Sequence, residues 1–132
     1  MLAGNELAVA AFVHPALVKI SDSSHAEGAQ MLARMLGRVM PVFYAAVLVF
    51  SLTVAWQSGW AAVPVIVATV YAASIVLRAT ALVPINNRIA AMDAAHPPAD
   101  WKALRSRWDN LHRVRVAMLV LAVILAALRL AA

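Results

Sequence analysis

Residues 101–115 read WKALRSRWDNLHRVR and run into the apolar segment 116–130 without a helix breaker. As a helix, this stretch places one set of side chains on a single face, at i, i+3, i+4 and i+7 spacing. The set is Trp101, Leu104, Trp108, Leu111, His112 and Arg115. A second face, predicted to meet water or lipid headgroups, carries Lys102, Arg105, Asp109 and Arg113. Charge, aromatic rings and a histidine therefore meet where this helix enters a membrane, and they mark a candidate site.

The composition predicts a membrane protein. Of the 132 residues, 64% are hydrophobic and 13% are charged, and the mean hydropathy is +0.83. A soluble domain of this length cannot bury so much apolar surface, and the natural solvent is therefore a lipid bilayer. The length suits one domain, residues 1–132, without a second one.

Charge and cysteine content exclude several classes of site. The net charge is +5, but the basic residues adjoin apolar segments and form no continuous patch with interleaved aromatic rings, so no nucleic-acid partner is expected. The chain has no cysteine, which excludes disulfides, iron–sulfur clusters and thiolate zinc sites. His, Glu, Asp and Asn remain as the strong ligand types.

Four apolar segments predict four membrane-spanning helices, each near the ~20 residues that a bilayer core requires. Their bounds are 2–20, 40–57, 61–83 and 111–130. Amphipathic residues from position 25, and the stretch 101–110, predict interfacial helical extensions before the second and fourth spans. The connections are short, so we expect an all-α, up-down-up-down transmembrane four-helix bundle.

Local signals set the ends and bends of these helices. The first segment lacks a basic leader and carries Glu6 and His14, which favours a retained membrane helix over a signal peptide. Pro15 is expected to kink it, and Pro84 to end the third span. Pro41 is expected in the first turn of the second span. Asp22, Ser23 and Ser24 are predicted caps, as is Asp100 after the loop AAHPPAD at 94–100.

Positive charge predicts the orientation in a plasma or inner membrane. The first and third connections carry Lys19, Arg34, Arg38, Arg88, Lys102, Arg105, Arg107 and Arg113. The N-terminus and the turn 56–60, which is flanked by tryptophans, carry no Lys or Arg. By the positive-inside rule, both termini face outward and both long connections face the cytoplasm.

Several polar residues are expected at one depth. From the helical rise, His14, Arg78 and Arg115 lie roughly 6–9 Å below the cytoplasmic interface. Asn86, Asn87, Trp108 and His112 are expected at that interface. Convergence of polar groups in a bundle favours a pocket there. Glu6 is expected roughly 12 Å further from the cytoplasm than His14, so its carboxyl group must be protonated, paired with Arg78 or Arg115, or in a wet cavity.

Other roles for these residues stay open. Arg78 and Arg115 could extend to the headgroups, Asn86 and Asn87 could cap a helix after Pro84, and Trp101 and Trp108 could serve as interfacial anchors. His25 and His96 lie on connections and are expected to be solvated.

Three pieces of the sequence resemble the anthrone oxygenase-like family of small four-span membrane proteins, most of which have no assigned substrate. These are GNELAVAAFVHPAL at 4–17, LVPINNRI at 82–89 and the stretch 101–115. The resemblance implies an oxygen-using reaction on a small aromatic molecule in the bilayer, with oxidation of anthrones to anthraquinones in some branches. It implies that the family's recurrent polar residues are His14, Asn86, Trp108, His112 and Arg115.

The residues allow three chemistries. Without a cofactor, His112 or His14 could remove a proton from a carbon acid while Arg115 or Asn86 stabilises the oxyanion, and the carbanion would then react with dioxygen. Alternatively, His14, His112 and Glu6 or Asn86 could hold a single iron or copper ion. The third chemistry is a haem held by the two histidines.

The expected partners are the lipid bilayer, a small hydrophobic substrate and dioxygen, with a homo-oligomer left open. A non-catalytic alternative is a small membrane subunit or transport accessory that conducts ions or binds lipid, with Arg78 and Glu6 as pathway residues. In a purely structural alternative, the polar residues serve only helix association.

Overall fold

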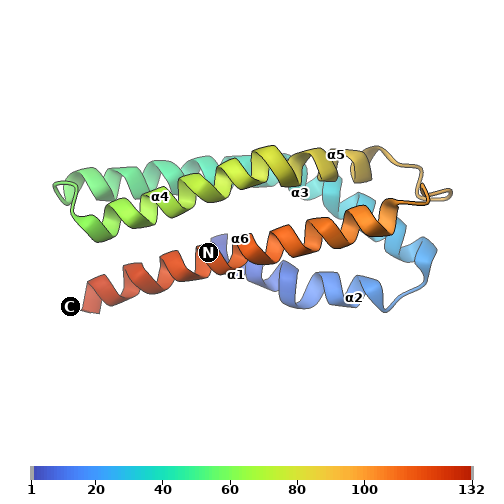
Figure 1. The fold of residues 1–132 in the computed structure, drawn as a ribbon, viewed down its shortest axis with the longest axis horizontal. Helices are drawn as coiled ribbons and strands as arrows, with labels where there is room; N and C mark the ends of the chain where they lie inside the picture. The colour runs from blue at the N-terminus through green and yellow to red at the C-terminus, as the bar shows by residue number, and fades with distance from the viewer. Residues whose placement is uncertain (1, 132) are drawn as a thin grey trace.

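The computed structural model describes residues 2–131 and folds them into four helical arms, with no β-strand in that range. The first arm comprises α1 (Leu2–Ala8), the π-helical turn η1 (Val9–Val13) and α2 (His14–Val18). The second arm is the single helix α3 (Asp22–Gln57). In Figure 1 the chain turns back on itself at each connection between arms.

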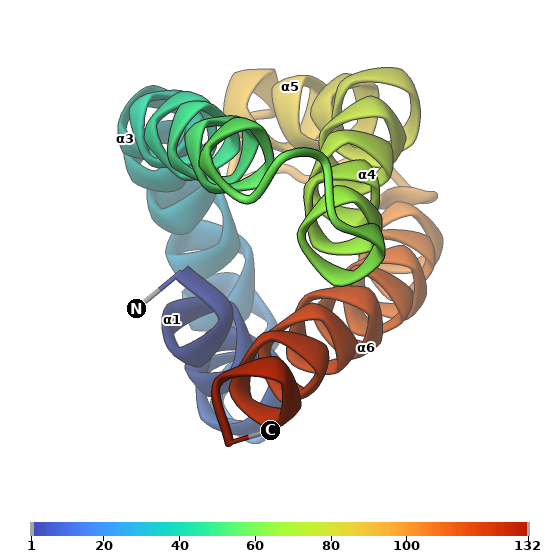
Figure 2. The same ribbon diagram turned by 90° about the vertical axis from the view of Figure 1, so that its left-hand side faces the viewer.

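The third arm comprises α4 (Ala62–Leu77), the π-helical turn η2 (Arg78–Leu82) and α5 (Val83–Ala91). The fourth arm is α6 (Trp101–Ala131). Seen along the bundle in Figure 2, the four arms surround a common centre. The predicted all-α four-helix fold is confirmed.

Three of the arms are long and apolar enough to cross a membrane, which marks the chain as an integral membrane protein. They comprise residues 22–57, 62–91 and 101–129. The first arm, Leu2–Val18, is apolar but shorter, about 25 Å at 1.5 Å per residue. It begins roughly midway along the bundle in Figure 1. In the half that the first arm does not reach, α3, α4 and α6 line an apolar cavity of about 500 Å³ that is partly open.

The helix α3 differs from its prediction at its start and in its length. Ser21, not Asp22, Ser23 or Ser24, is the N-cap, and its Oγ accepts a hydrogen bond from the Ser24 amide at 3.4 Å. The predicted interfacial extension and second span form one uninterrupted helix. Pro41 therefore lies in the interior of a helix, where the sequence predicted a first turn.

The third arm continues past Pro84 to Ala91, so the prediction that this helix ends at the proline is wrong. In η2 the Val83 amide donates to the Arg78 carbonyl, and in η1 the His14 amide donates to the Val9 carbonyl. Each bond reaches back five residues instead of four. Both prolines, Pro15 and Pro84, follow directly after these residues. The wider π turn accommodates a residue that lacks an amide hydrogen and would clash with a regular preceding turn.

The π turns also change which side chains share a face. Glu6 and His14 are eight residues apart, as are Arg78 and Asn86. In a regular α-helix an eight-residue spacing separates two side chains by about 80°, whereas one inserted residue reduces this to the ~20° of a seven-residue spacing. Each pair therefore faces the bundle centre together, and all four residues line one central cavity.

Small residues bring the arms close together at the end that carries the loop 92–100. Ala26, Ala29 and Ala33 of α3 pack against buried residues of α5 and α6. The Gln30 side chain donates to the Met92 carbonyl, and Arg34 Nε donates to the Ala90 carbonyl at 2.9 Å. These bonds satisfy carbonyls at the end of α5 that have no partner within the helix.

The chain turns between helices near both predicted connections, 56–60 and 94–100. Gly59 and Trp60 adopt positive φ angles of 63° and 61° in the turn after α3. The Asp100 carbonyl accepts from the Leu104 amide at 3.0 Å and so starts α6, while the Asp100 carboxylate pairs with Arg88 at 3.1 Å. His96 is exposed as expected. His25 is instead buried against Trp101, because α3 begins before it.

Removing one residue from η1 tests the register argument. We expect a deletion of Ala11, combined with Pro15→Ala, to leave a regular α-helix that keeps Glu6 and His14 on one face. The midpoint of thermal unfolding in detergent should then stay within about 5 °C of the unaltered protein.

The matched control is a deletion of Ala46, an exposed residue in the regular part of α3. This deletion rotates half of that helix by about 100° and should prevent cooperative unfolding or lower its midpoint by more than 10 °C or so. Equal losses in the two deletions would contradict the register argument.

Candidate functional site

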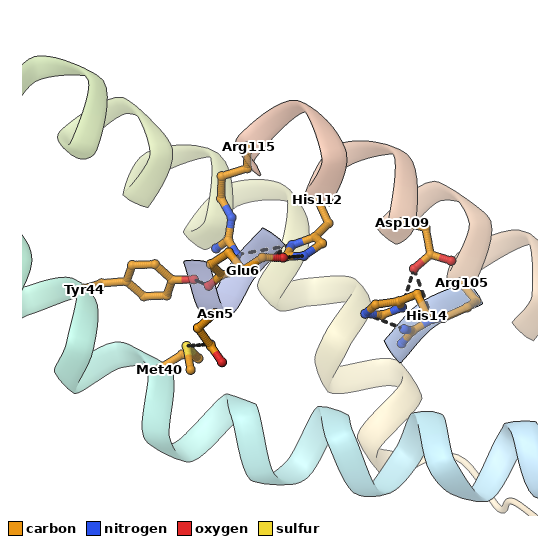
Figure 3. Close-up of polar contacts among 9 residues, drawn as sticks. All are labelled: Asn5, Glu6, His14, Met40, Tyr44, Arg105, Asp109, His112 and Arg115. Atoms are coloured by element: carbon orange, nitrogen blue, oxygen red, sulfur yellow. Dashed lines mark hydrogen bonds and ion pairs between the residues drawn. The ribbon is translucent and has the colours of Figure 1, made fainter. Parts of the chain in front are cut away.

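Polar side chains from the first, second and fourth arms meet in the bundle interior in two groups (Figure 3). Arg78 and Asn86 of the third arm line the same cavity. One group surrounds Glu6 and the other surrounds His14. On α6 their partners are Arg115 and Asp109, which are six residues and about 9 Å apart along the helix axis. Arg115 therefore lies at the level of Glu6, whereas the sequence placed it at the depth of His14.

The Glu6 carboxylate is 3% exposed and has three polar neighbours. Its Oε1 accepts from the Tyr44 hydroxyl, and its Oε2 accepts from Arg115 Nη2. Nδ1 of His112 lies 3.4 Å from Oε2. A carboxylate in an apolar bundle is stable only when it is paired or protonated, and of the alternatives considered from the sequence, the pair with Arg115 is the one found.

The second group surrounds His14 and lies nearer to the start of α6 than the group around Glu6. Nδ1 of His14 is 2.8 Å from Asp109 Oδ1, and its Nε2 is 2.9 Å from Arg105 Nη2. Arg105 Nε lies 3.3 Å from the same Asp109 oxygen. Arg105 is 5% exposed. The predicted solvated face of α6 is therefore wrong for Arg105 and Asp109, because the first arm packs against them, and it is correct for exposed Lys102 and Arg113.

Aromatic rings connect the two groups. The Trp108 indole stacks on the His14 imidazole at a centroid distance of 4.9 Å and on the His112 imidazole at 4.6 Å. The two imidazoles are themselves 5.8 Å apart. The three rings form a closed triangle, and Trp108 is buried in it instead of serving as an anchor in the interface.

Hydrogen-bond partners determine which ring nitrogen carries the proton in each of the two histidines. Arginine can only donate, so His14 Nε2 accepts from Arg105 and its proton lies on Nδ1, facing Asp109. For His112, the Glu6 carbonyl can only accept, so Nε2 donates to it at 3.2 Å. His112 Nδ1 is then an acceptor, and it receives Arg115 Nη2 at 3.3 Å.

Tyr44 lies between two cations. The Cζ atoms of Arg78 and Arg115 lie 4.8 Å and 5.0 Å from the centroid of its ring. Tyr44 is 4% exposed, so Arg78 directs its guanidinium inward instead of extending to headgroups. Within residues 2–131, Arg78 has no carboxylate within 4 Å, whereas Arg105 and Arg115 each have one.

A cavity of about 40 Å³ lies among these side chains. It has room for one or a few water molecules or for one dioxygen molecule. In the described part of the chain, Nε and Nη1 of Arg115 are buried without a hydrogen-bond partner. Arg115 lines the cavity, so the site holds donors that a bound oxygen atom could satisfy.

The sequence model of the anthrone oxygenase family matches residues 29–125. The chain belongs to the anthrone oxygenase family. The matched range includes Tyr44, Arg78 and all of the site residues on α6, while Glu6 and His14 precede it. No curated protein and no solved structure shows significant similarity to the chain.

The site of this anthrone oxygenase family member brings together the six residues predicted from the sequence to be catalytic or to bind metal. Glu6, His14, Asn86, Trp108, His112 and Arg115 all line the central cavity. The Asn86 amide also donates to the Ala33 carbonyl at 2.9 Å and so joins α5 to α3, instead of capping a helix. The catalytic roles of these residues stay predictions.

Sequence reasoning missed Tyr44, Arg105 and Asp109. Arg105 and Asp109 are four residues apart with opposite charge, a spacing that indicates a pair on one helix face, but only the packing of the first arm buries them. Tyr44 is the one residue with a phenolic hydroxyl in its arm. A single hydroxyl-bearing ring within an apolar span was the feature of the sequence that could have pointed to Tyr44.

The side chains proposed to bind a metal are engaged by protein partners. Both nitrogens of His14 face Asp109 or Arg105, and Glu6 is paired with Arg115 and Tyr44. Among residues 2–131, no three His, Asp or Glu side chains converge as a metal-binding set. Iron or copper ligation by His14, His112 and Glu6 stays a prediction that requires each to exchange its partner. The 40 Å³ cavity beside both histidines does not fit a haem.

Breaking the buried pair tests whether it holds the first arm in place. Glu6→Gln and Arg115→Met should each reduce the free energy of unfolding by about 3–5 kcal/mol, because each leaves a buried charge unpaired. The double variant should lose less than the sum of the two. Thermal unfolding in detergent measures all three.

Arg113→Met is the control, since Arg113 is exposed and lies two residues from Arg115. It should melt within about 2 °C of the unaltered protein, because surface charges contribute little. Additive losses in the double variant would show that Glu6 and Arg115 are not coupled.

Proposed function

We propose that this anthrone oxygenase family member is a membrane-embedded oxygenase that acts on a small hydrophobic carbonyl compound such as an anthrone. The observation that carries the proposal is the pairing of a base with an oxyanion site. His112 presents an acceptor nitrogen beside Arg115, whose Nε and Nη1 have no partner among the described residues. The reacting group would lie in the central cavity, near the predicted cytoplasmic interface.

The first step is proton removal from the carbon acid. His112 Nδ1 takes a proton from the methylene group, which in an anthrone lies across the central ring from the carbonyl and is conjugated with it through the aromatic rings, and the substrate becomes an enolate. Arg115 turns its donors from His112 to the enolate oxygen, where negative charge develops. The imidazolium that forms lies 3.4 Å from Glu6 Oε2, which stabilises the positive charge.

Dioxygen then oxidises the enolate. One electron passes from the carbanion to dioxygen, and the two radicals combine to form a carbon–oxygen bond and a peroxide anion. The peroxide takes the proton from His112 and becomes a hydroperoxide. Loss of the second methylene proton and cleavage of the O–O bond give a ketone and one water molecule. The methylene group and dioxygen are thus converted to a carbonyl and water, with no other oxidant.

The protein contributes burial and charge to this reaction. The closed triangle of rings and the apolar arms limit water at the enolate, which strengthens its interaction with Arg115. Trp108 holds His112 by stacking, and the Glu6 carbonyl fixes its tautomer.

A non-catalytic membrane subunit is the alternative, because the Glu6–Arg115 pair also joins the first arm to α6. Substitution of His112 separates the two functions. An oxygenase loses turnover while its fold survives, whereas a structural subunit loses only stability or assembly.

The test follows oxygen uptake and quinone absorbance with anthrone, using protein in lipid nanodiscs and subtracting the rate in empty discs. His112→Gln should lower kcat by about 10²–10⁴-fold, the range of general-base contributions. His96→Gln is the matched control, because His96 lies on an exposed loop, and it should keep the full rate. Retained turnover in His112→Gln, or loss only together with unfolding, would refute the proposal.

Metal analysis separates this route from the metal route. Oxygen uptake should survive treatment with a chelator, because proton removal by His112 needs no ion. The comparison is between the unaltered protein and the His14→Ala, His112→Ala double variant. Stoichiometric iron or copper that is lost in the double variant would instead support ligation by these histidines.

A further inference from the structure

The central cavity is too small for the ring system of an aromatic substrate. A groove of about 430 Å³ adjoins it between α3 and the third arm, and this volume lies in the range of small-molecule sites. Five residues line both spaces, namely Gly37, Tyr44, Arg78, Val83 and Asn86. The two spaces are therefore neighbours, and Tyr44 and Arg78 belong to the wall between them.

The charge of this region is unbalanced. Glu6 pairs with Arg115, and Asp109 lies beside Arg105. Arg78 lines both the groove and the cavity, and within residues 2–131 no carboxylate lies within 4 Å of its guanidinium. A half-buried cation within a membrane-spanning arm is costly unless an anion or another strong acceptor meets it.

We propose that the groove binds the body of the substrate and that Arg78 binds an anionic oxygen on it, such as a carboxylate or an ionised phenol. The substrate class is thus an acidic aromatic that reaches the site from the bilayer, between α3 and the third arm. This assignment rests on the proposed function, since it places the reacting carbon toward His112.

The other walls of the groove suit such a ligand. Pro41, Ala45, Leu48, Ile75 and Ala79 supply apolar surface, and the amides of Asn86 and Asn87 supply polar groups elsewhere along the same groove. The π turn that begins at Arg78 places Arg78 and Asn86 on one face. A smaller space of about 200 Å³ on the far side of the site is lined by both Asp109 and Arg113, so its charges are balanced and it gives no preference for an anion.

Two fluorescent probes of the same ring size test the charge preference. We would titrate 9-anthracenecarboxylate and 9-anthracenemethanol into the protein in phosphatidylcholine nanodiscs and subtract the signal of empty discs. The anion should bind at least ten times more tightly than the alcohol. Arg78→Gln should reduce this preference to about twofold, while Arg88→Gln should leave it unchanged, because Arg88 is exposed and paired with Asp100.

A lipid headgroup is the other source of an anion for Arg78, and competition distinguishes it. Dodecyl phosphate should not displace 9-anthracenecarboxylate at equal concentration. Displacement would overturn the proposal and assign Arg78 to lipid phosphate. An anion preference that survives in Arg78→Gln would overturn it as well.

Filling the groove gives a test that leaves Arg78 in place. Ala79→Trp should weaken the binding of both probes about tenfold or more, whereas Ala73→Trp, exposed on the same arm but outside the groove, should not. Unchanged binding in Ala79→Trp would show that the probes bind elsewhere. These binding measurements need no turnover, so they separate the two proposals. Probe binding without oxygen uptake contradicts only the proposed function. Oxygen uptake that depends on His112, without probe binding, contradicts only this inference.

Discussion

A carboxylate held inside an apolar bundle is the constraint on which the interior depends. Glu6 can stay there only because Arg115 and Tyr44 bind its two oxygens and His112 bonds its backbone carbonyl. These contacts draw the first arm against α6 and fix the ring plane of His112. They also hold Arg115 at a depth where its remaining donors lack partners. The contacts of Glu6 therefore stabilise the packing of the arms and also position Arg115, the group that would bind an oxyanion.

The two π turns supply the matching geometry on the other arms. Each lies beside a proline and brings two polar residues, eight positions apart, onto one face. Glu6 and His14 thereby reach successive levels of α6, while Arg78 and Asn86 reach the cavity and the groove together. An extra residue in a helix weakens local hydrogen bonding, and such turns are often kept where function needs the altered register.

Much of the fold could be predicted from the sequence because apolar length and turn residues act locally. The face that carries Trp108, His112 and Arg115 was found from periodicity, since α6 is a regular α-helix from Trp101 onward. Burial of Arg105 and Asp109 could not be found this way, because it depends on which side of α6 the first arm occupies. Periodicity also presumes a constant twist. It therefore missed the added residue in each π turn, although Pro15 and Pro84 did signal a disturbance.

An apolar cluster, here called the apolar plug, lies between the polar site and the other end of the bundle. Leu2, Met40 and Tyr44 form a cluster with Val47 and Tyr71, and the latter two line the large apolar cavity at the other end of the bundle. The polar groups thus lie between this plug and the end of the bundle that carries the loop 92–100. Protons released and taken up during a reaction at this site would come from and return to one aqueous compartment. No net charge would cross the bilayer, so the membrane potential would neither drive nor oppose turnover.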